Sequence, residues 1–501
     1  NTTGTGNVAV GANALDANTT ASNNTAVGYN ALLANTTGAT NTAVGREALD
    51  ANTTGSDNVA MGNGALGSNT TASNNTAIGS NCLAGNTTGT GCVAIGHDCM
   101  EASNADYNTG VGWEAMKSLS AGNYNTGLGV QALYGNTTGN YNTAVGNNAL
   151  QTASTGDRNS AVGYQASLNT TTGVGNCSVG HKAGRNTTTG DYNVAMGDQA
   201  LESSTTGDKN IAIGGFALHD STTTANNTAI GYNAMGGSTT ATTSVAVGYL
   251  ALDAANTGAA NVAIGYQALS TNTGGNSNTA IGKGSLLECT TGGSNCALGT
   301  ASLQDLTDGI YNIGIGYRTG GYSVALSTGD YNILIGSDAY TLGSDAQHQI
   351  VVGTYQDQGK GTNTGFIQPN GGGVYQGNNS SSWSTTSDRR IKKNIVNNTT
   401  GLDKINQITV RNFEYKTQDE IISDFPELTD VSEAAVVDRE GIQLGVIAQE
   451  IETILPDVVK TESSGVKSVD PDNLTWYLVN AVKELSAENT ALKARLDAAG
   501  L

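Results

Sequence analysis

Apolar and polar positions alternate in a short run that returns every 17 residues along most of the chain. The run first reads Asn7-Val8-Ala9-Val10-Gly11 and returns as Asn24-Thr25-Ala26-Val27-Gly28. Its last residue, called here the anchor glycine, falls at 11, 28, 45, 62, 79, 96, 112, 129, 146, 163, 180, 197, 214, 231, 248, 265, 282, 299, 316, 336 and 353. These 21 anchors keep the 17-residue step, apart from one step of 16 (96 to 112) and one of 20 (316 to 336). So strict a period predicts a stack of one small structural unit.

Each unit has the composition of a short strand between turns. β-branched and apolar residues stand on alternate positions, with Asn, Thr, Ser and Gly on both sides. Seventeen residues are too few for a helical hairpin but suit one coil of a β-solenoid, for which we expect two strands and two turns. No proline precedes Pro369, as expected where nearly every backbone N–H donates to a neighbouring coil. We therefore predict a mainly β fold, with a parallel β-roll or β-solenoid over residues 1–353.

Equivalent positions in stacked coils predict ladders of identical side chains. The residue four before the anchor is Asn in 18 of the 21 units, with Cys92, Ser244 and Gln349 as exceptions. Stacked Asn amides can hydrogen-bond along the axis without any ligand. The residue directly before the anchor is Val, Ile, Met or Leu, and we expect it to face the core. The residue two before is mostly Ala or Gly, and we expect a small-residue face there that a second surface can approach closely.

The Asn-x-Ala-Val/Ile-Gly-x-x-Ala repeats resemble the head domains of trimeric autotransporter adhesins, and similar repeats occur in phage fibres. The resemblance covers roughly residues 1–353. It implies a parallel β-roll associated as three chains, although the period here is longer than is usual in those heads.

Composition and charge narrow the classes of function. A length of 501 residues would normally suggest about three globular domains, but 5% aromatic and 13% charged residues with 68 Gly argue against large globular cores. A formal charge of −20 disfavours nucleic acid and anionic membranes as partners. No apolar run is long enough to span a bilayer, so we predict no membrane insertion. The chain opens at Asn1-Thr2-Thr3-Gly4, in mid-repeat and without Met, and we expect a fragment or processed piece whose attachment end is missing.

The six cysteines and four histidines predict no metal site, and we predict no cofactor. Cys82 and Cys99 both stand three residues after an anchor, where stacking would place their Cα atoms about 4.8 Å apart, within reach of a disulfide. The alternative is two buried small hydrophobic side chains.

The period fails after Gly353. Residues 354–386 are rich in Gly, Asn, Ser and Gln, with aromatic residues interspersed. They are either a flexible linker or an irregular tip that binds a carbohydrate or protein receptor. The candidate tip residues are Tyr355, Phe366, Tyr375 and Trp383.

Residues 387–501 have the composition of an ordinary α+β domain. Thr409 to Lys416 alternates like a strand, and Gly445 to Glu450 leads into a short amphipathic helix that stops at Pro456. We expect a final helix from Asn473 to Ala499, whose apolar steps of four and three form a heptad seam with one Asn that fixes register. The candidate trimerisation residues of this seam are Leu478, Val482, Leu485, Asn489, Leu492 and Leu496.

The junction of repeats and domain reads Ser387-Asp388-Arg389-Arg390-Ile391-Lys392. A serine hydroxyl becomes a nucleophile beside a base, and a lysine serves as that base only when desolvation or nearby positive charge lowers its pKa. Arg390 and Lys393 are candidates for that charge, and Asp388 opposes it unless an arginine engages it.

With the Gly-x-Ile-Ala-Gln-Glu stretch and the final helix, residues 387–501 look like the C-terminal intramolecular chaperone of endosialidases and other phage tail fibres. That resemblance implies a domain that trimerises first, guides folding of the fibre and then cuts itself off before the motif serine. Carried over, the scissile bond is Thr386–Ser387, with Ser387 as nucleophile and Lys392 as base, supported by Asp388 and Arg390.

We interpret the chain as a structural and adhesive homotrimeric phage tail-fibre segment, extracellular and in the virion. Its implied partners are its own copies, a host cell-surface glycan or protein, and the rest of a virion fibre or tail through the missing N-terminal part. Its only predicted enzymatic activity is autoproteolysis of the Ser-Lys type. The alternatives are a bacterial cell-surface adhesin of the trimeric head type, a polysaccharide-degrading phage spike, and an ice-binding Thr-ladder solenoid that leaves the terminal domain unexplained.

Overall fold

A computed structural model describes residues 2–321, 323–368, 374–376, 383–385, 389, 392–417, 420–421, 424, 441–461 and 467–500. It divides the chain into two compact units, Asn1–Thr386 and Ser387–Leu501. Each unit is described by itself. We call the solenoid of the first unit the shaft.

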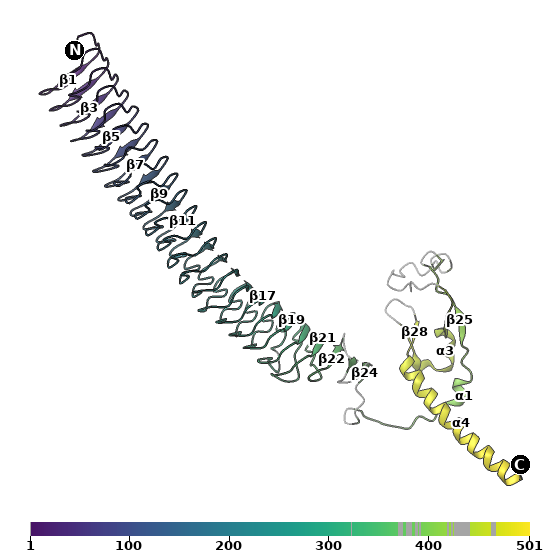
Figure 1. The fold of residues 1–501 in the computed structure, drawn as a ribbon. Coiled ribbons are helices and arrows are strands. Elements are labelled where there is room, and N and C mark those ends of the chain that lie inside the picture. The colour runs from purple at the N-terminus through teal and green to yellow at the C-terminus, as the bar shows by residue number, and fades with distance from the viewer. Residues whose placement is uncertain are drawn as a thin grey trace. The chain divides into compact units, whose positions relative to one another are not determined.

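The shaft is a β-solenoid in which one three-residue strand recurs in each coil, and Figure 1 shows these strands stacked one behind another. Its regular strands are β1 Val8–Val10, β2 Thr25–Val27, β3 Thr42–Val44, β4 Val59–Met61, β5 Thr76–Ile78, β6 Val93–Ile95, β7 Thr109–Val111, β8 Thr126–Leu128, β9 Thr143–Val145, β10 Ser160–Val162, β11 Cys177–Val179, β12 Val194–Met196, β13 Ile211–Ile213, β14 Thr228–Ile230, β15 Val245–Val247, β16 Val262–Ile264, β17 Thr279–Ile281, β18 Cys296–Leu298 and β19 Ile313–Ile315.

The register confirms the period. Successive strands pair in parallel, and Ala9 of β1 lies opposite Ala26 of β2, which lies opposite Ala43 of β3. The short step of 16 residues appears as the pair Val93 and Thr109, and the long step of 20 as the pair Ile313 and Ile333. The mainly β, parallel solenoid fold is therefore confirmed. The expectation of two strands per coil is wrong, because the remainder of each coil is turns that still hydrogen-bond to the next coil, as from the N–H of Leu32 to the carbonyl of Ala48 at 3.0 Å.

The core of the shaft inverts the faces expected from the sequence. The small residue two before the anchor is fully buried, as in Ala26, while the bulky residue directly before the anchor points outward, as in Met61, which is 42% exposed. Each coil is narrow, and its interior is already filled by the Ala and Leu three and four residues after the anchor, such as Ala31 and Leu32. Only a small side chain then fits inside the strand, so the β-branched residues on either side face outward.

The Asn ladder lies inside the coil and bonds mainly to backbone. The side-chain oxygen of Asn142 accepts the backbone N–H of Asn159 at 2.9 Å, and its amide group donates to the carbonyl of Gly156 at 2.8 Å. Some neighbours also bond amide to amide, as Asn58 does to Asn41 at 3.1 Å. These bonds satisfy buried backbone groups that water cannot reach.

The shaft ends in longer strands, β20 Ile333–Ser337, β21 Ile350–Tyr355 and β22 Gly365–Gln368, followed by β23 Val374–Gln376 and β24 Trp383–Thr385. The pairing stays parallel to β22 and becomes antiparallel between β22, β23 and β24. Phe366 is only 3% exposed and belongs to the shaft core with Val351 and Leu334, so its prediction as a receptor-facing tip residue is wrong. The side chains of Tyr375 and Trp383 lie outside the described residues.

The second unit contains α1 Leu402–Ile405, β25 Arg411–Phe413, β26 Gln443–Gly445, α3 Ala448–Ile454, the 3₁₀ turn η3 Pro456–Val458, β27 Val459–Thr461, β28 Lys467–Val469 and α4 Pro471–Ala499. Both strand pairs are antiparallel. Ile451, Leu455 and Val458 form its buried core. The predicted small α+β region that ends in a long helix is confirmed.

The start of α4 is fixed by local chemistry. Asp470 is the N-cap, and its carboxylate accepts the backbone N–H groups of Asp472 at 3.0 Å and Asn473 at 3.3 Å. Pro471 follows at the first helical position, where its missing N–H costs nothing and its fixed φ favours the helix. None of the described helices is both long and apolar enough to cross a membrane.

Candidate functional site

The candidate cleavage motif lies at the division between the two units. Thr386, Ser387, Asp388 and Arg390 lie outside the described residues. Lys392 is described, and its backbone N–H donates to the carbonyl of Arg389 at 3.2 Å. Every residue from 392 to 400 is exposed in the single chain. That the side chains of Ser387 and Lys392 lie close together therefore stays a prediction from the sequence.

The segment that follows the motif is tied to α4. The side-chain amide of Asn480 donates to the carbonyls of Asn398 at 3.0 Å and Thr400 at 3.2 Å. A carboxylate oxygen of Glu484 accepts the backbone N–H of Leu402 at 2.7 Å and so satisfies a free donor at the start of α1. These bonds join the exposed segment to one turn of the long helix.

Gly401 permits this close approach. A Cβ atom placed there would lie 2.4 Å from the backbone nitrogen of Ala481 and 2.6 Å from the carbonyl carbon of Asn480. Ala481 is itself buried beneath the segment. We call this contact of residues 398–402 with Asn480, Ala481 and Glu484 the clamp. Sequence reasoning missed it, and a glycine directly before a short helix was the one available signal.

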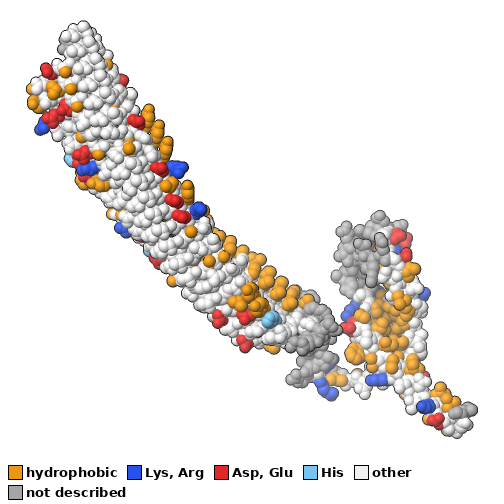
Figure 2. All heavy atoms as spheres, in the orientation of Figure 1, with side chains coloured by type: hydrophobic (Ala, Val, Ile, Leu, Met, Phe, Trp, Pro, Cys, Tyr) orange, Lys and Arg blue, Asp and Glu red, His pale blue; other side chains and the backbone are white. Residues whose placement is uncertain are grey.

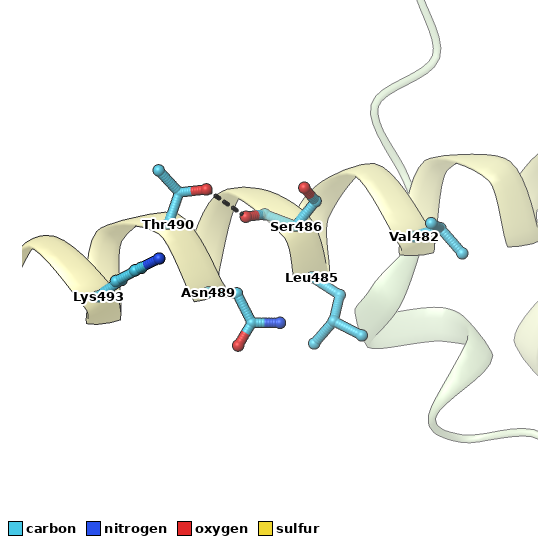
Figure 3. A pocket seen from close by; sticks show the side chains of 6 residues that line it. All are labelled: Val482, Leu485, Ser486, Asn489, Thr490 and Lys493. Atoms are coloured by element: carbon cyan, nitrogen blue, oxygen red, sulfur yellow. Dashed lines mark hydrogen bonds between the residues drawn. The ribbon is translucent and has the colours of Figure 1, made fainter.

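The exposed face of α4 carries the predicted heptad seam. Figure 3 shows Leu485 and Asn489 projecting from the same side of the helix, in the shallow pocket that they line with Val482. Val482 is 60% exposed, and Leu478, Leu485, Leu492 and Leu496 are also exposed. A run of exposed large apolar side chains on a soluble surface marks an interface.

The outer face of the shaft sheet carries a second apolar row. It consists of the residue directly before each anchor, and exposed members of it include Met61, Ile95, Met196, Ile213 and Leu298. Figure 2 shows hydrophobic side chains gathered in rows along the shaft. Because the row is continuous over many coils, it is a second candidate interface.

The cysteines and histidines considered for metal or redox chemistry are placed by the structure. No group of His, Cys, Asp and Glu suited to a metal ion occurs among the described residues. Cys82 and Cys99 are buried and not bonded to each other. The thiol of Cys99 donates a hydrogen bond to the sulfur of Cys82, and this bond, together with burial, raises the pKa of Cys99.

Comparison with known proteins identifies one part of the chain. Residues 387–460 match the Peptidase_S74 family, described as the chaperone of endosialidase. No curated protein and no solved structure matches the chain. The chain thus combines a long parallel β-solenoid with a C-terminal domain similar to the chaperone of endosialidase. This combination fits a protein of the tail-fibre or spike type.

Proposed function

We propose that the chain is part of a homotrimeric tail fibre that attaches a virion to a host surface, and that its C-terminal domain assembles the trimer and then cuts the Thr386–Ser387 bond. One observation carries this proposal. The match to the chaperone of endosialidase begins at residue 387, the same residue at which the second compact unit begins. A domain that cuts itself off has to fold as a unit separate from the shaft. The coincidence of the two boundaries at residue 387 supports such a unit.

The proposed reaction uses Ser387 on its own N-terminal peptide bond. The Oγ attacks the carbonyl carbon of Thr386 while Lys392 accepts the hydroxyl proton. The C–N bond breaks, the amine of Ser387 takes up a proton, and an ester joins Thr386 to Ser387. Water then hydrolyses that ester and leaves the fragments 1–386 and 387–501. The serine is thus both nucleophile and new N-terminus.

The exposure of Lys392 supports a dependence on assembly. A lysine serves as a general base only where burial or nearby positive charge lowers its pKa. The clamp ties the segment after Lys392 to α4, whose apolar seam points into solvent in the single chain. We infer that trimerisation through α4 supplies the burial that Lys392 needs and therefore precedes cleavage.

The proposed chaperone role follows from the shaft itself. Coils with the same register can pair one repeat out of step at little cost, so three shafts have many near-equivalent alignments. Non-local β assembly is also slow and exposed to aggregation. A trimeric domain at one end fixes the alignment once.

The attachment role rests on the architecture of the whole chain. A long, rigid and weakly charged shaft with exposed side-chain rows suits a spacer that carries a binding surface. A host cell-surface glycan or protein is the proposed receptor, with Tyr355, Tyr375 and Trp383 retained as candidate tip residues. The rest of a virion fibre is the proposed partner at the other end.

The cleavage proposal is tested with Ser387→Ala in the full chain. The wild type should release the fragment 387–501 on a denaturing gel and in mass spectrometry, and Ser387→Ala should run as one band near 50.7 kDa. Lys392→Arg keeps the positive charge but is too basic to take the proton, and it should also remain whole. Release of the fragment by Ser387→Ala would show that an outside protease makes the cut.

A further inference from the structure

Tyrosines lie on either side of a two-coil gap on the surface of the shaft. At the position directly after the anchor, Tyr249 and Tyr266 stack with ring centroids 5.4 Å apart. The next two coils carry Lys283 and Thr300 there, and the third carries Tyr317. At about 4.8 Å per coil, Tyr266 and Tyr317 stand about 14 Å apart along the axis.

Small side chains at the neighbouring position make this gap deeper. Two residues after the anchor, the same two coils carry Gly284 and Ala301, whereas the flanking coils carry Gln267 and Arg318. A Cβ placed at Gly284 would meet no atom within 4 Å. Together with Gln304, these residues line a pocket on the side of the shaft. An aromatic ring stands at each end, and the lining between them mixes small and apolar residues, such as Leu287, with polar ones.

Two positively charged side chains, Lys283 and Arg318, line this groove. The ammonium of Lys283 lies 5.7 Å from the centroid of the Tyr266 ring, and none of the ion pairs among the described residues involves Lys283. Arg318, 5.9 Å from the centroid of Tyr317, is already paired with Asp338 at 3.6 Å. An anionic group in the groove would therefore find Lys283 unopposed by a protein carboxylate.

We propose that the groove between Tyr266 and Tyr317 binds a short oligosaccharide that carries a carboxylate. The flat C–H faces of sugar rings rest on exposed aromatic rings, and Tyr266 and Tyr317 are 46% and 52% exposed. Gln267, Gln304 and Thr300 are hydrogen-bonding partners for hydroxyl groups, and Lys283 pairs with the carboxylate. The inference rests on the proposed attachment function and assigns it an acidic glycan as receptor.

The repeat supplies a substitution that fills the groove without straining the fold. Gly284 has φ +61°, and Asn81 holds the equivalent position of another coil at φ +55°. Gly284→Asn therefore restores a side chain that this backbone already tolerates. Tyr29→Ala is the matched control, because Tyr29 stands at the position of Tyr266 in a distant coil and is also about half exposed.

The test is binding of the full-length protein to an array of immobilised uronic-acid oligosaccharides and neutral oligosaccharides of the same length. The wild type and Tyr29→Ala should bind the acidic set equally. Gly284→Asn and Tyr266→Ala should bind it about tenfold more weakly. Lys283→Gln should lose the preference for acidic over neutral sugars, with neutral binding unchanged.

Two results would overturn the site. The first is no binding of the wild type to any uronic-acid oligosaccharide, which includes the case in which assembled copies cover the groove. The second is acidic binding that Gly284→Asn leaves unchanged, which would place the glycan elsewhere and leave the attachment function standing. The proposed attachment function is contradicted by a different result, in which the wild type binds no glycan on the array and does not bind whole host cells.

Discussion

Single residues set the spacing of the coils. Most anchor glycines have φ between +128° and +144°, a region closed to side chains, and their missing Cβ lets the next coil approach. At Gly163 an added Cβ would lie 2.4 Å from the carbonyl oxygen of Gly180. Leucines four residues after the anchor also adopt left-handed φ, as in Leu32 at +51°, and their burial offsets a cost of about 1 kcal/mol each.

Gly163→Ala should therefore destabilise the shaft by about 1–3 kcal/mol, because both the backbone conformation and the contact with Gly180 oppose it. Thermal unfolding followed by circular dichroism measures the effect. Gly64→Asn is the control. Gly64 has φ +66° at the position that Asn81 occupies in the next coil, so this variant should unfold like the wild type. Equal melting of all three proteins would contradict the role of the anchor.

The Asn ladder gives a second prediction at this scale. Asn142→Leu removes the partners of the N–H of Asn159 and the carbonyl of Gly156, both inside the coil. Each buried group left without a partner costs about 1–3 kcal/mol, so the melting temperature should fall clearly. Asn147→Leu, on the exposed surface of the same coil, should leave it nearly unchanged. A variant Asn142→Leu as stable as Asn147→Leu would show that water satisfies these groups.

Among the elements, α4 connects the candidate junction to the rest of its unit. Its N-cap Asp470 also accepts a hydrogen bond from Lys460 at 2.8 Å. That bond, together with the backbone N–H of Asn473, lowers the pKa of Asp470. The charged carboxylate therefore stabilises the folded state above its unfolded pKa, near 4, and this contribution is lost as the pH falls through the lower folded value.

We expect Asp470→Asn to melt at a lower temperature than the wild type at pH 7, because Asn keeps the capping oxygen but not the charge. The difference should shrink below about pH 4 and disappear in stronger acid. Melting curves of the two proteins over this range measure it, and other carboxyl groups cancel in the comparison. A difference that stays constant with pH would show that the charge contributes nothing.

At the scale of the whole molecule, two exposed apolar surfaces call for the same partner. We propose that further copies of the chain cover the seam of α4 and the outer face of the shaft sheet. Cys177 and Cys296 stand on the outer face, in β11 and β18, and are half-buried in the single chain. The rate at which their thiols react with a reagent therefore measures whether another chain covers that face.

Light scattering of the full-length protein should give the mass of three chains. Leu485→Lys places a charge in the seam and should shift the protein toward smaller species, whereas Ala487→Lys, on the opposite side of the helix, should not. Cys177 and Cys296 should react more slowly with a thiol reagent in the trimer than in the dissociated variant. A wild-type monomer at micromolar concentration would contradict the proposal.

The sequence by itself determined the period, the parallel stacking, the Asn ladder and the small α+β region with its final helix. Each follows from local repetition: the same residues at the same spacing meet the same neighbours, so one coil predicts the rest. The proposed roles of Ser387 and Lys392 are also sequence predictions, drawn from a motif and its position.

Only the tertiary structure decided which face of each strand is inside. Alternation tells two faces apart but not which one is buried, and in the regular three-residue strands the narrow coil and the leucine of the turn left room only for a small side chain. Phe366 lies in the core because β22 extends the parallel stack beyond Gly353 and places Phe366 opposite the buried Val351. The clamp and the groove depend on residues that only folding brings together, Gly401 with Ala481 and Tyr266 with Tyr317.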